Sequence, residues 1–475
     1  MIVKNEEANL PACLDPVADL VDEIIVVDTG STDRTKEVAA GLGARVFDFA
    51  WVDSFAAARN ESKLHATGDW ILWLDADDRI DEVNRQRLRE LLAGLHDEVA
   101  AYLVSIDVLP SGPSDPIRVV HHARLFRNHP KVRWHYRVHE QVLPTVLAAG
   151  GTILRTDVVI RHIGYQDSSL KAIKLQRNLR LMRLDEQEHP NDPFVLYNLG
   201  RAYERLDRIA ESLPYWKRSL KHAPPMETYV RKIYSLLAQG YFKVGQRADA
   251  LQACLGGLAR FPEDPELLFL VGSILFEQGD PVAAEACLTR LLALPPATHM
   301  ALGDDPGLAT YKARHMLARI NHEKQNHAEA ERLWRLVLAE QPNFVPGWLG
   351  MGQTQVERKN WVELDSILEK LESHSDGAVA AAVLRGLRHA VQKDFRTARK
   401  LMEETIAANP KSLEPRILLS RLCMRDRRLD PASAERAVRG VLELDPTNAE
   451  AQRQLTKLAT DTAPASKSLA SGTVR

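Results

Sequence analysis

The chain has 475 residues, of which 45% are hydrophobic and 27% are charged, and its formal net charge is −2. This length predicts two or more domains, and the composition is typical of a soluble globular protein. The near-neutral charge excludes a polybasic surface for nucleic acid. No apolar run reaches the ~20 residues that cross a bilayer. The four dispersed cysteines indicate neither disulfides nor a zinc site. Because the N-terminus has no signal-peptide pattern, we expect a cytoplasmic protein.

The first part of the chain, to about residue 165, alternates short apolar runs with amphipathic stretches, and we place an α/β domain at 1–168. The last three predicted strands have no long helices between them, so we expect a Rossmann-like mixed sheet. The expected strands are 23–27, 45–49, a strand from residue 70, 101–106, 119–126 and 153–161, and the expected helices are 33–42, 53–66 and 81–95.

The rest of the chain loses its strand-like runs, and helical patterns recur in pairs that end in proline. Their spacing is close to the ~34-residue period of tetratricopeptide repeats. The run 194–203 has the Leu-Gly…Tyr pattern of a first repeat helix, and 267–272 repeats it. We therefore predict an all-α solenoid of roughly seven repeat units at 169–459. The small, polar residues 460–475 are expected to form a disordered tail.

Three carboxylates follow the apolar run 70–74, which reads as a buried strand. Side chains two apart on a strand share a face, so Asp75 and Asp77 are expected to converge at the carboxyl end of a central strand. Like charges at that distance favour a hard cation between them, Mg²⁺ or Mn²⁺. The alternative is a cap for the helix near residue 81, a role that suits Asp78 or Asp81 better.

A second polar turn begins with Asp28, which ends the strand 23–27 and precedes the small hydroxyl residues of a helix start. Such a turn suits a nucleotide base and ribose. The alternative is a local one, in which Asp33 or Thr32 caps the helix and Asp28 satisfies the turn. Because GxGxxG is missing, a dinucleotide site is disfavoured.

Four motifs, at 1–7, 27–33, 55–60 and 72–78, occur in the order seen in family 2 glycosyltransferases of the GT-A fold. The chain resembles in particular the SunS-like branch, in which this domain is fused to tetratricopeptide repeats. The resemblance implies an inverting transfer of a sugar from a nucleotide-diphosphate donor, often UDP-linked, with Mn²⁺ or Mg²⁺. Two alternatives stay open: a non-catalytic tetratricopeptide scaffold with a degenerate nucleotide-binding domain, and a nucleotidyltransferase, for which no Gly/Lys-rich triphosphate loop is evident.

The resemblance also implies roles for individual residues on the donor side. Asp77 corresponds to the direct metal ligand of the DxD motif. Arg59 corresponds to an arginine near the pyrophosphate or the sugar, and its alternative role is an ion pair in the scaffold. The remaining donor-side residues are Asn5 and Glu6 beside the nucleotide, Asp28 at the uracil or ribose, and Asp75 near the ribose or sugar.

The acceptor side depends on a Trp…His-Glu element at 134–140, which resembles that of the same branch. Inverting transfer needs a base opposite the leaving group, and Glu140 is the candidate, with His139 as second choice. The alternative is a structural ion pair of Glu140 with Arg133 or Arg137. His162 stands where such enzymes place a histidine near the metal, and a structural role at the strand end is equally open.

The repeats form a concave groove that suits extended peptides or helices. We expect the groove to hold a protein or peptide acceptor or to pair two copies of the chain. A stabilising role unrelated to substrate is the alternative. Members of the family have several apolar residues before the position of Met1, so the first strand is expected to be truncated and the floor of the nucleotide pocket weakened.

Overall fold

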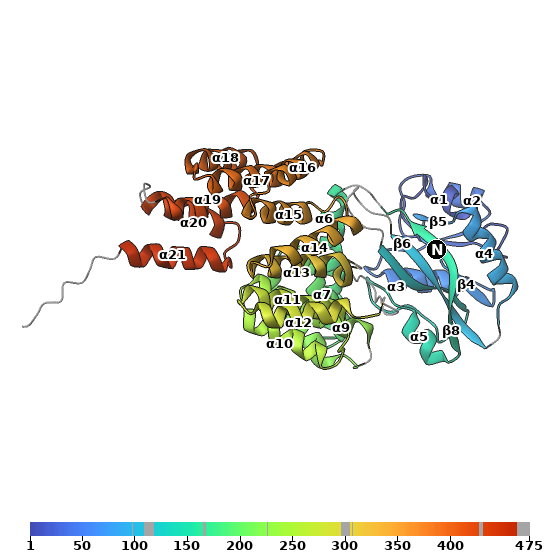
Figure 1. The fold of residues 1–475 in the computed structure, drawn as a ribbon. Helices are drawn as coiled ribbons and strands as arrows, with labels where there is room; N and C mark the ends of the chain where they lie inside the picture. The colour runs from blue at the N-terminus through green and yellow to red at the C-terminus, as the bar shows by residue number, and fades with distance from the viewer. Residues whose placement is uncertain are drawn as a thin grey trace, which may run out of the picture. The chain divides into compact units, whose positions relative to one another are not determined.

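The computed structural model describes residues 1–96, 98–108, 118–164, 168–225, 227–295, 305, 307–426 and 431–462. The chain divides into two compact units, of which the first holds Met1–Ile233 and the second begins at Tyr234, inside a helix. Figure 1 labels the helices and strands. No helix among the described residues is both long and apolar enough to span a lipid bilayer.

The strands and helices of the α/β domain confirm the predicted elements to within a few residues, and three short elements were not predicted: α1, β5 and α5. The strands are β1 (Ile2–Val3), β2 (Ile25–Asp28), β3 (Arg45–Asp48), β4 (Trp70–Leu72), β5 (Asp78–Arg79), β6 (Val99–Val108), β7 (Arg118–Arg127) and β8 (Thr152–His162). The helices are α1 (Leu10–Leu14), α2 (Thr35–Gly41), α3 (Phe55–Leu64), α4 (Glu82–Ala93) and α5 (Leu143–Ala149).

The strands form two hydrogen-bonded sheets. A parallel sheet has the order β1-β2-β3, and a five-stranded sheet has the order β4-β7-β6-β8-β5. In the second sheet β6 and β8 are parallel, whereas β4/β7, β6/β7 and β5/β8 are antiparallel. The predicted mixed sheet is therefore confirmed. The expectation that the acidic residues follow a central strand is wrong, because β4 is the edge strand of its sheet.

The acidic residues lie in a turn beyond β4, which ends at Leu72. The backbone N–H of Asp78 donates to the Asp75 carbonyl at 3.0 Å, and the N–H of Asp75 donates to Asp78 Oδ2 at 2.8 Å. Asp75 and Asp77 do converge beyond the end of β4, as predicted, with ligand atoms within 4.8 Å of each other. The predicted cause is wrong, because a tight turn and not strand alternation sets their directions. Asp81 caps α4 through the N–H of Asn84, and Asp78 has a different role.

The helical region contains seven successive helix pairs in the described part of the chain, α7/α8 to α19/α20, as predicted, preceded by α6 and followed by α21. The helices are α6 (Ser168–Glu188), α7 (Pro193–Arg205), α8 (Ile209–His222), α9 (Thr228–Lys243), α10 (Arg247–Leu258), α11 (Pro265–Glu277), α12 (Pro281–Leu292), η1 (Leu308–Lys312), α13 (Ala313–Glu323), α14 (His327–Glu340), α15 (Val345–Glu357), α16 (Trp361–Glu372), α17 (Ala378–Val391), α18 (Phe395–Ala408), α19 (Glu414–Arg425), α20 (Pro431–Leu442) and α21 (Ala449–Thr462).

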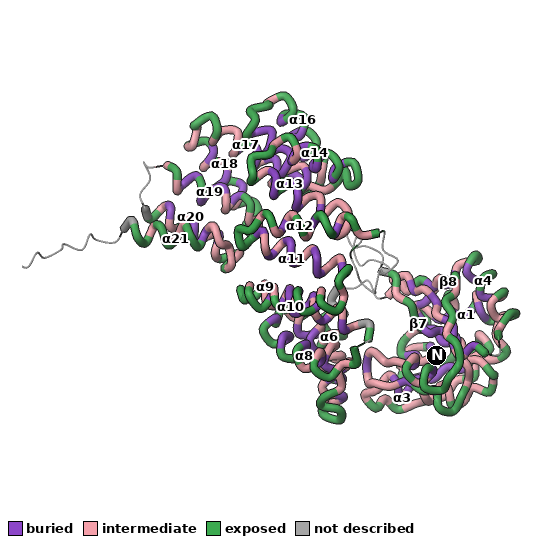
Figure 2. The backbone as a smooth tube through the Cα atoms, turned by 60° about the horizontal axis from the view of Figure 1, so that its bottom comes forward, coloured by how far each residue is buried: buried purple, intermediate pink, exposed green. Residues whose placement is uncertain are grey.

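The pairs pack through small residues on one helix and large ones on the next. Gly200 of α7 lies against the buried indole of Trp216 in α8, where an added Cβ would come within 2.2 Å of the ring. Gly350 of α15 lies against Trp334 of α14 in the same way. In Figure 2 the buried residues of α11, α12 and α13 mark the sides on which these helices pack. The predicted tail, 460–475, lies outside the described residues except for its first three, which end α21.

Candidate active site

The turn after β4 brings three carboxylates and one imidazole together. Asp75, Asp77, Asp78 and His162 each offer a ligand atom, and these atoms lie within 4.8 Å of one another. Pairing of β5 with β8 sets Asp78 directly opposite His162. The ring Nδ1 of His162 lies 3.0 Å from Asp78 Oδ1 and 3.4 Å from Asp77 Oδ1. Residues more than 80 positions apart thus form one potential metal site.

A buried arginine from β7 balances part of this charge. Arg124 Nη2 lies 3.2 Å from Asp75 Oδ2, and its Nη1 lies 3.0 Å from Asp78 Oδ2. Both Arg124 and Asp78 are almost fully buried, with exposed fractions of 2% and 1%. Sequence reasoning missed Arg124 and considered Asp78 only as a helix cap. An arginine between the apolar residues Ala123 and Leu125 of a predicted strand was the available signal for Arg124.

A second buried arginine, Arg59 of α3, links the acidic turn to the loop after β7. Its Nη2 donates to Asp75 Oδ1 and its Nε donates to Glu140 Oε1, both at 2.7 Å. The predicted alternative pairing of Glu140 with Arg133 or Arg137 is therefore wrong, since Arg59 is the partner. The ion pair considered for Arg59 does exist, and its two partners are themselves candidate site residues.

The two guanidinium groups are further held by an aromatic ring. Arg124 lies 3.7 Å and Arg59 lies 4.3 Å from the centre of the Trp73 ring. A cation over an indole face gains electrostatic attraction from the ring. Trp73 is itself fixed by its Nε1–H, which donates to the Ala123 carbonyl at 2.7 Å. The positions of both arginines are therefore set before any ligand arrives.

Asp77 differs from its two acidic neighbours because no ion pair joins it to an arginine among the described residues. Burial raises the pKa of Asp77, with His162 pulling the other way. Burial also opposes ionisation of Asp75, but Arg59 and Arg124 hold its pKa well below the usual range. The hydrogen bond to Asp78 raises the pKa of His162. Asp77 is thus the carboxylate most in need of a further positive charge.

The residues expected at the nucleotide lie at the carboxyl ends of β1 and β2. Asp28 is buried, and its Oδ1 accepts from the N–H groups of Gly30 and Ser31, both at 2.8 Å. Asp28 therefore accepts the hydrogen bonds of the backbone donors in the turn, as the local interpretation predicted. Its other oxygen, Oδ2, is buried and has no hydrogen-bond partner in the described structure. Asp33 closes the start of α2, as the same interpretation predicted, because its Oδ1 accepts from the N–H of Thr35, the first residue of α2, at 3.0 Å; the N-cap position itself holds Arg34.

Asn5 and Glu6 begin the loop that faces this turn. Asn5 has a positive φ of 56°, and its Oδ1 accepts from the Thr32 N–H at 2.8 Å. Glu6 Oε2 accepts from Asn9, whose own Oδ1 accepts from Arg79 of β5. A chain of polar contacts therefore connects the first-strand loop to the strand that carries Asp78.

The loop that carries Glu140 is packed against the first helices after the α/β domain. Val138 belongs to a buried cluster with Leu181 of α6 and Leu199 of α7. The backbone N–H of Arg137 donates to Asp185 of α6 at 3.0 Å. These contacts lie inside the first compact unit. The start of the helical region thus helps to fix the loop of a candidate catalytic residue.

Comparisons with known proteins relate the two regions of the chain to two families. Residues 1–151 match the model of the glycosyl transferase family 2, and 235–298 match a tetratricopeptide-repeat model. A TPR repeat-containing protein of Synechococcus elongatus is 36% identical over 50% of this chain and 59% of its own length. The SPbeta prophage-derived glycosyltransferase SunS of Bacillus subtilis is 28% identical over 47% of this chain and 52% of its own. The chain thus matches little more than half the length of these relatives.

Among solved structures, the match to a tetratricopeptide repeat protein from Parabacteroides merdae spans 53% of this chain and 93% of that protein's chain, with 19% identity and a TM-score of 0.43. The N-terminal α/β domain is thus similar to family 2 glycosyltransferases, SunS among them, and the helix pairs that follow it are similar to tetratricopeptide repeats.

Proposed function

We propose that the chain is a metal-dependent, inverting glycosyltransferase that moves a sugar from a nucleotide-diphosphate donor, preferably UDP-linked, to a protein or peptide. The single observation that carries the proposal is the acidic turn. Asp75, Asp78 and Glu140 pair with the guanidinium groups of Arg59 and Arg124, and Asp77 pairs with neither. With all four carboxylates ionised, their negative charge exceeds that of the two guanidinium groups by two, which is the charge that a divalent cation neutralises.

The residues present fit Mn²⁺ or Mg²⁺. Both carboxylate oxygens of Asp75 are already in ion pairs, each with a different arginine. Asp77 has no such partner and is half-buried, and His162 lies beside it. We assign Asp77 as the direct ligand, with His162 as the second. A bound cation would stabilise the negative charge that develops on the departing diphosphate.

Glu140 is the proposed base. Its side chain is mostly buried, and Arg59 orients it through the bond to Oε1. In an inverting transfer the acceptor loses its proton as it attacks the sugar from the side opposite the diphosphate. Because Arg59 also holds Asp75, it fixes the spacing between the base and the donor side of the site.

Asp28 is the proposed contact to the nucleotide. Its unpartnered Oδ2 is a buried acceptor, and a buried carboxylate oxygen without a donor costs free energy. An N–H of a base or a hydroxyl of a ribose would supply that donor. Asn5 and Glu6, at the end of β1, are proposed to line the same pocket.

The repeats are proposed to hold the acceptor. Helix pairs of this kind expose concave surfaces that bind peptides, and the match at 235–298 supports a protein-interaction role. Pairing of two copies through the repeats is the other use that such a surface allows.

The test is a donor-hydrolysis screen of the full chain across nucleotide sugars, with and without Mn²⁺. We expect one donor to turn over, in the presence of metal. Asp77→Ala should lose turnover by roughly 100-fold or more with an almost unchanged melting temperature. The exposed Asp157 on β8 provides a matched control, Asp157→Ala, that should keep turnover. Normal turnover by Asp77→Ala would remove the metal assignment.

A further inference from the structure

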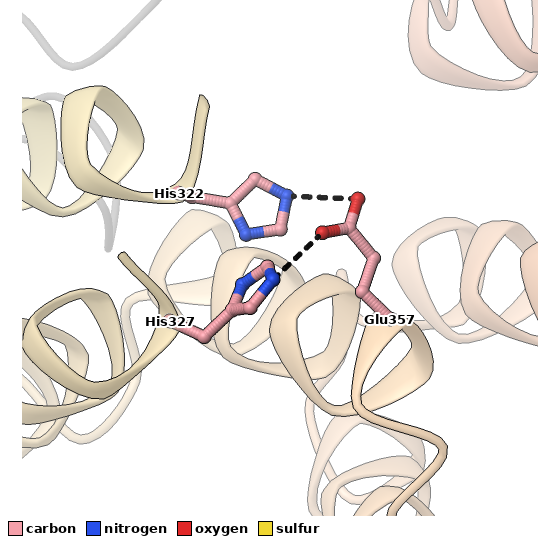
Figure 3. Close-up of side chains that lie close together, drawn as sticks. All are labelled: His322, His327 and Glu357. Atoms are coloured by element: carbon pink, nitrogen blue, oxygen red, sulfur yellow. Dashed lines mark ion pairs between the residues drawn. The ribbon is translucent and has the colours of Figure 1, made fainter. Parts of the chain in front are cut away.

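A second group of potential metal ligands lies in the repeat region, within the second compact unit. It consists of His322, His327 and Glu357, whose ligand atoms lie within 4.8 Å of one another. His322 comes from the last turn of α13, His327 begins α14, and Glu357 ends α15. Figure 3 shows both rings pointing toward the carboxylate. The group thus joins one helix pair to the first helix of the next.

The distances in this group do not fit hydrogen bonds. His322 Nε2 lies 3.4 Å from Glu357 Oε1, and His327 Nε2 lies 3.7 Å from Glu357 Oε2. Nitrogen–oxygen hydrogen bonds are usually about 2.7–3.2 Å long. Two ligands of a tetrahedral zinc ion with bonds of about 2.0–2.1 Å stand roughly 3.3–3.4 Å apart. The spacing is therefore closer to that of ligands around one cation.

The hydrogen bonds behind His322 define its tautomer. The Thr354 hydroxyl donates its proton to the Gly350 carbonyl at 3.0 Å. It can therefore only accept from His322 Nδ1, which lies 3.1 Å away. In the neutral ring the proton is then on Nδ1, and Nε2 directs a lone pair at the Glu357 carboxylate. Burial lowers the pKa of His322, with Glu357 pulling the other way, which favours this neutral ring.

The helix ends add to the demand for a positive charge. Glu357 is the last residue of α15, where the carbonyl groups of the helix present partial negative charge. A carboxylate at that position is unfavourable unless a cation compensates it. His322 lies one residue from the end of α13, another negative helix end. The side chain of Glu357 is 41% exposed, so an ion from solution can reach the group.

We propose that His322, His327 and Glu357 bind a zinc ion through the two Nε2 atoms and the carboxylate, with water as the fourth ligand. Two imidazoles and one carboxylate form a ligand set that zinc accepts. Thr354 acts as the outer partner that orients His322, as is usual for metal-bound histidines. The ion would link two successive repeats and stabilise their packing, a structural role that is separate from sugar transfer.

The experiment is calorimetric titration of zinc into the full chain, in an Asp77→Asn background that weakens the acidic turn of the α/β domain. We expect one zinc equivalent, with affinity reduced roughly 100-fold or more by His327→Ala and by Glu357→Gln. Thr354→Val, which keeps the volume and the ligands, should cost about tenfold. Cobalt(II) should give the intense visible absorption of a tetrahedral site in the unsubstituted repeat region.

The matched control is His389→Ala. His389 Nδ1 lies 3.4 Å from Asp394 Oδ2, so this pair has a similar histidine–carboxylate spacing but belongs to no three-ligand group among the described residues. Its substitution should leave zinc affinity unchanged. The proposal is overturned if the chain takes up no zinc, or if Glu357→Gln and His327→Ala bind it as tightly as His389→Ala does.

Discussion

The α/β domain and the repeat region bury different kinds of side chain. In the α/β domain the buried residues include two aspartates and two arginines, Asp28, Arg59, Asp78 and Arg124. The large buried cluster that runs from α11 to α17 is built from aliphatic and aromatic side chains. From α7 onward the described residues include two buried carboxylates, Asp264 and Glu331, and no buried arginine; Glu331 pairs with Arg335 and Arg358, whose side chains are exposed.

The difference in buried charge distinguishes a region suited to catalysis from a region whose role is structural. Buried charges are costly, because desolvation can exceed the attraction between partners. A site that keeps several of them side by side in a fixed arrangement is therefore a candidate for function. The repeats bury fewer charged side chains, and their stability comes mainly from apolar contact between neighbouring helices. Substitutions at the candidate site should therefore mainly lower turnover, and substitutions at the helix contacts of the repeats should mainly lower the free energy of unfolding.

The largest effect is expected at Glu140. Glu140→Gln keeps the shape of the side chain and its bond from Arg59 but removes the basic carboxylate. We expect kcat to fall by roughly 10²–10⁴-fold, with little change in the midpoint of urea unfolding. Steady-state kinetics with the donor found in the screen measures the first quantity. Unchanged kcat would assign Glu140 to the scaffold and weaken the contrast between the regions.

Arg124 tests whether the buried charges also stabilise the fold. Arg124→Ala leaves the buried carboxylates of Asp75 and Asp78 without a partner. We expect a loss of about 3–5 kcal/mol in the free energy of unfolding, measured by urea titration. The exposed Arg155 on β8 gives a control, Arg155→Ala, that should stay within ~0.5 kcal/mol. A loss no larger than that of the control contradicts the account.

Gly350 tests the packing of the repeats. An added Cβ would lie 2.3 Å from the Trp334 ring, so Gly350→Ala should destabilise by roughly 1–3 kcal/mol despite the better helix propensity of alanine. Gly256 in α10 meets its nearest neighbour at 3.5 Å. Gly256→Ala should therefore be neutral or stabilising. Equal melting temperatures for the two variants would show that close helix contact does not limit these repeats.

His315 is expected to give the smallest effect. Burial lowers its pKa from 6.5 to about 3, beside Trp334. The unfolded chain therefore binds more protons than the folded chain between these values, and stability falls as the pH drops through that window. The slope from this group is at most ~1.4 kcal/mol per pH unit. His315→Phe should flatten the dependence of the urea midpoint between pH 7 and pH 5, and an identical slope would refute it.

Much of the fold follows from local sequence patterns. The buried run of β2 and the alternation in β6 are encoded within single elements. The order of the strands is not, which is why β4 was expected in the centre of its sheet. The tight turn at 75–78 also escaped prediction, because its hydrogen bonds depend on β5 pairing with β8.

Site residues that lie in a local sequence motif could be predicted. Site residues that are brought in by the pairing of distant segments could not. Asp75, Asp77 and Glu140 stand in local motifs. Arg124 enters the site from the antiparallel neighbour of β4, and no spacing along the chain connects it to Asp75. The same holds for His322, His327 and Glu357, which are brought together by the stacking of successive repeats.

The central claim is that Asp77 and its neighbours hold a divalent cation against a nucleotide diphosphate. The most direct measurement is calorimetric titration of UDP into the full chain with and without Mn²⁺, for the unsubstituted protein and for Asp77→Asn. We predict binding that requires Mn²⁺ and that disappears in the variant. Heat of binding that is the same with and without the metal, or no binding of UDP to the unsubstituted chain, would contradict the account.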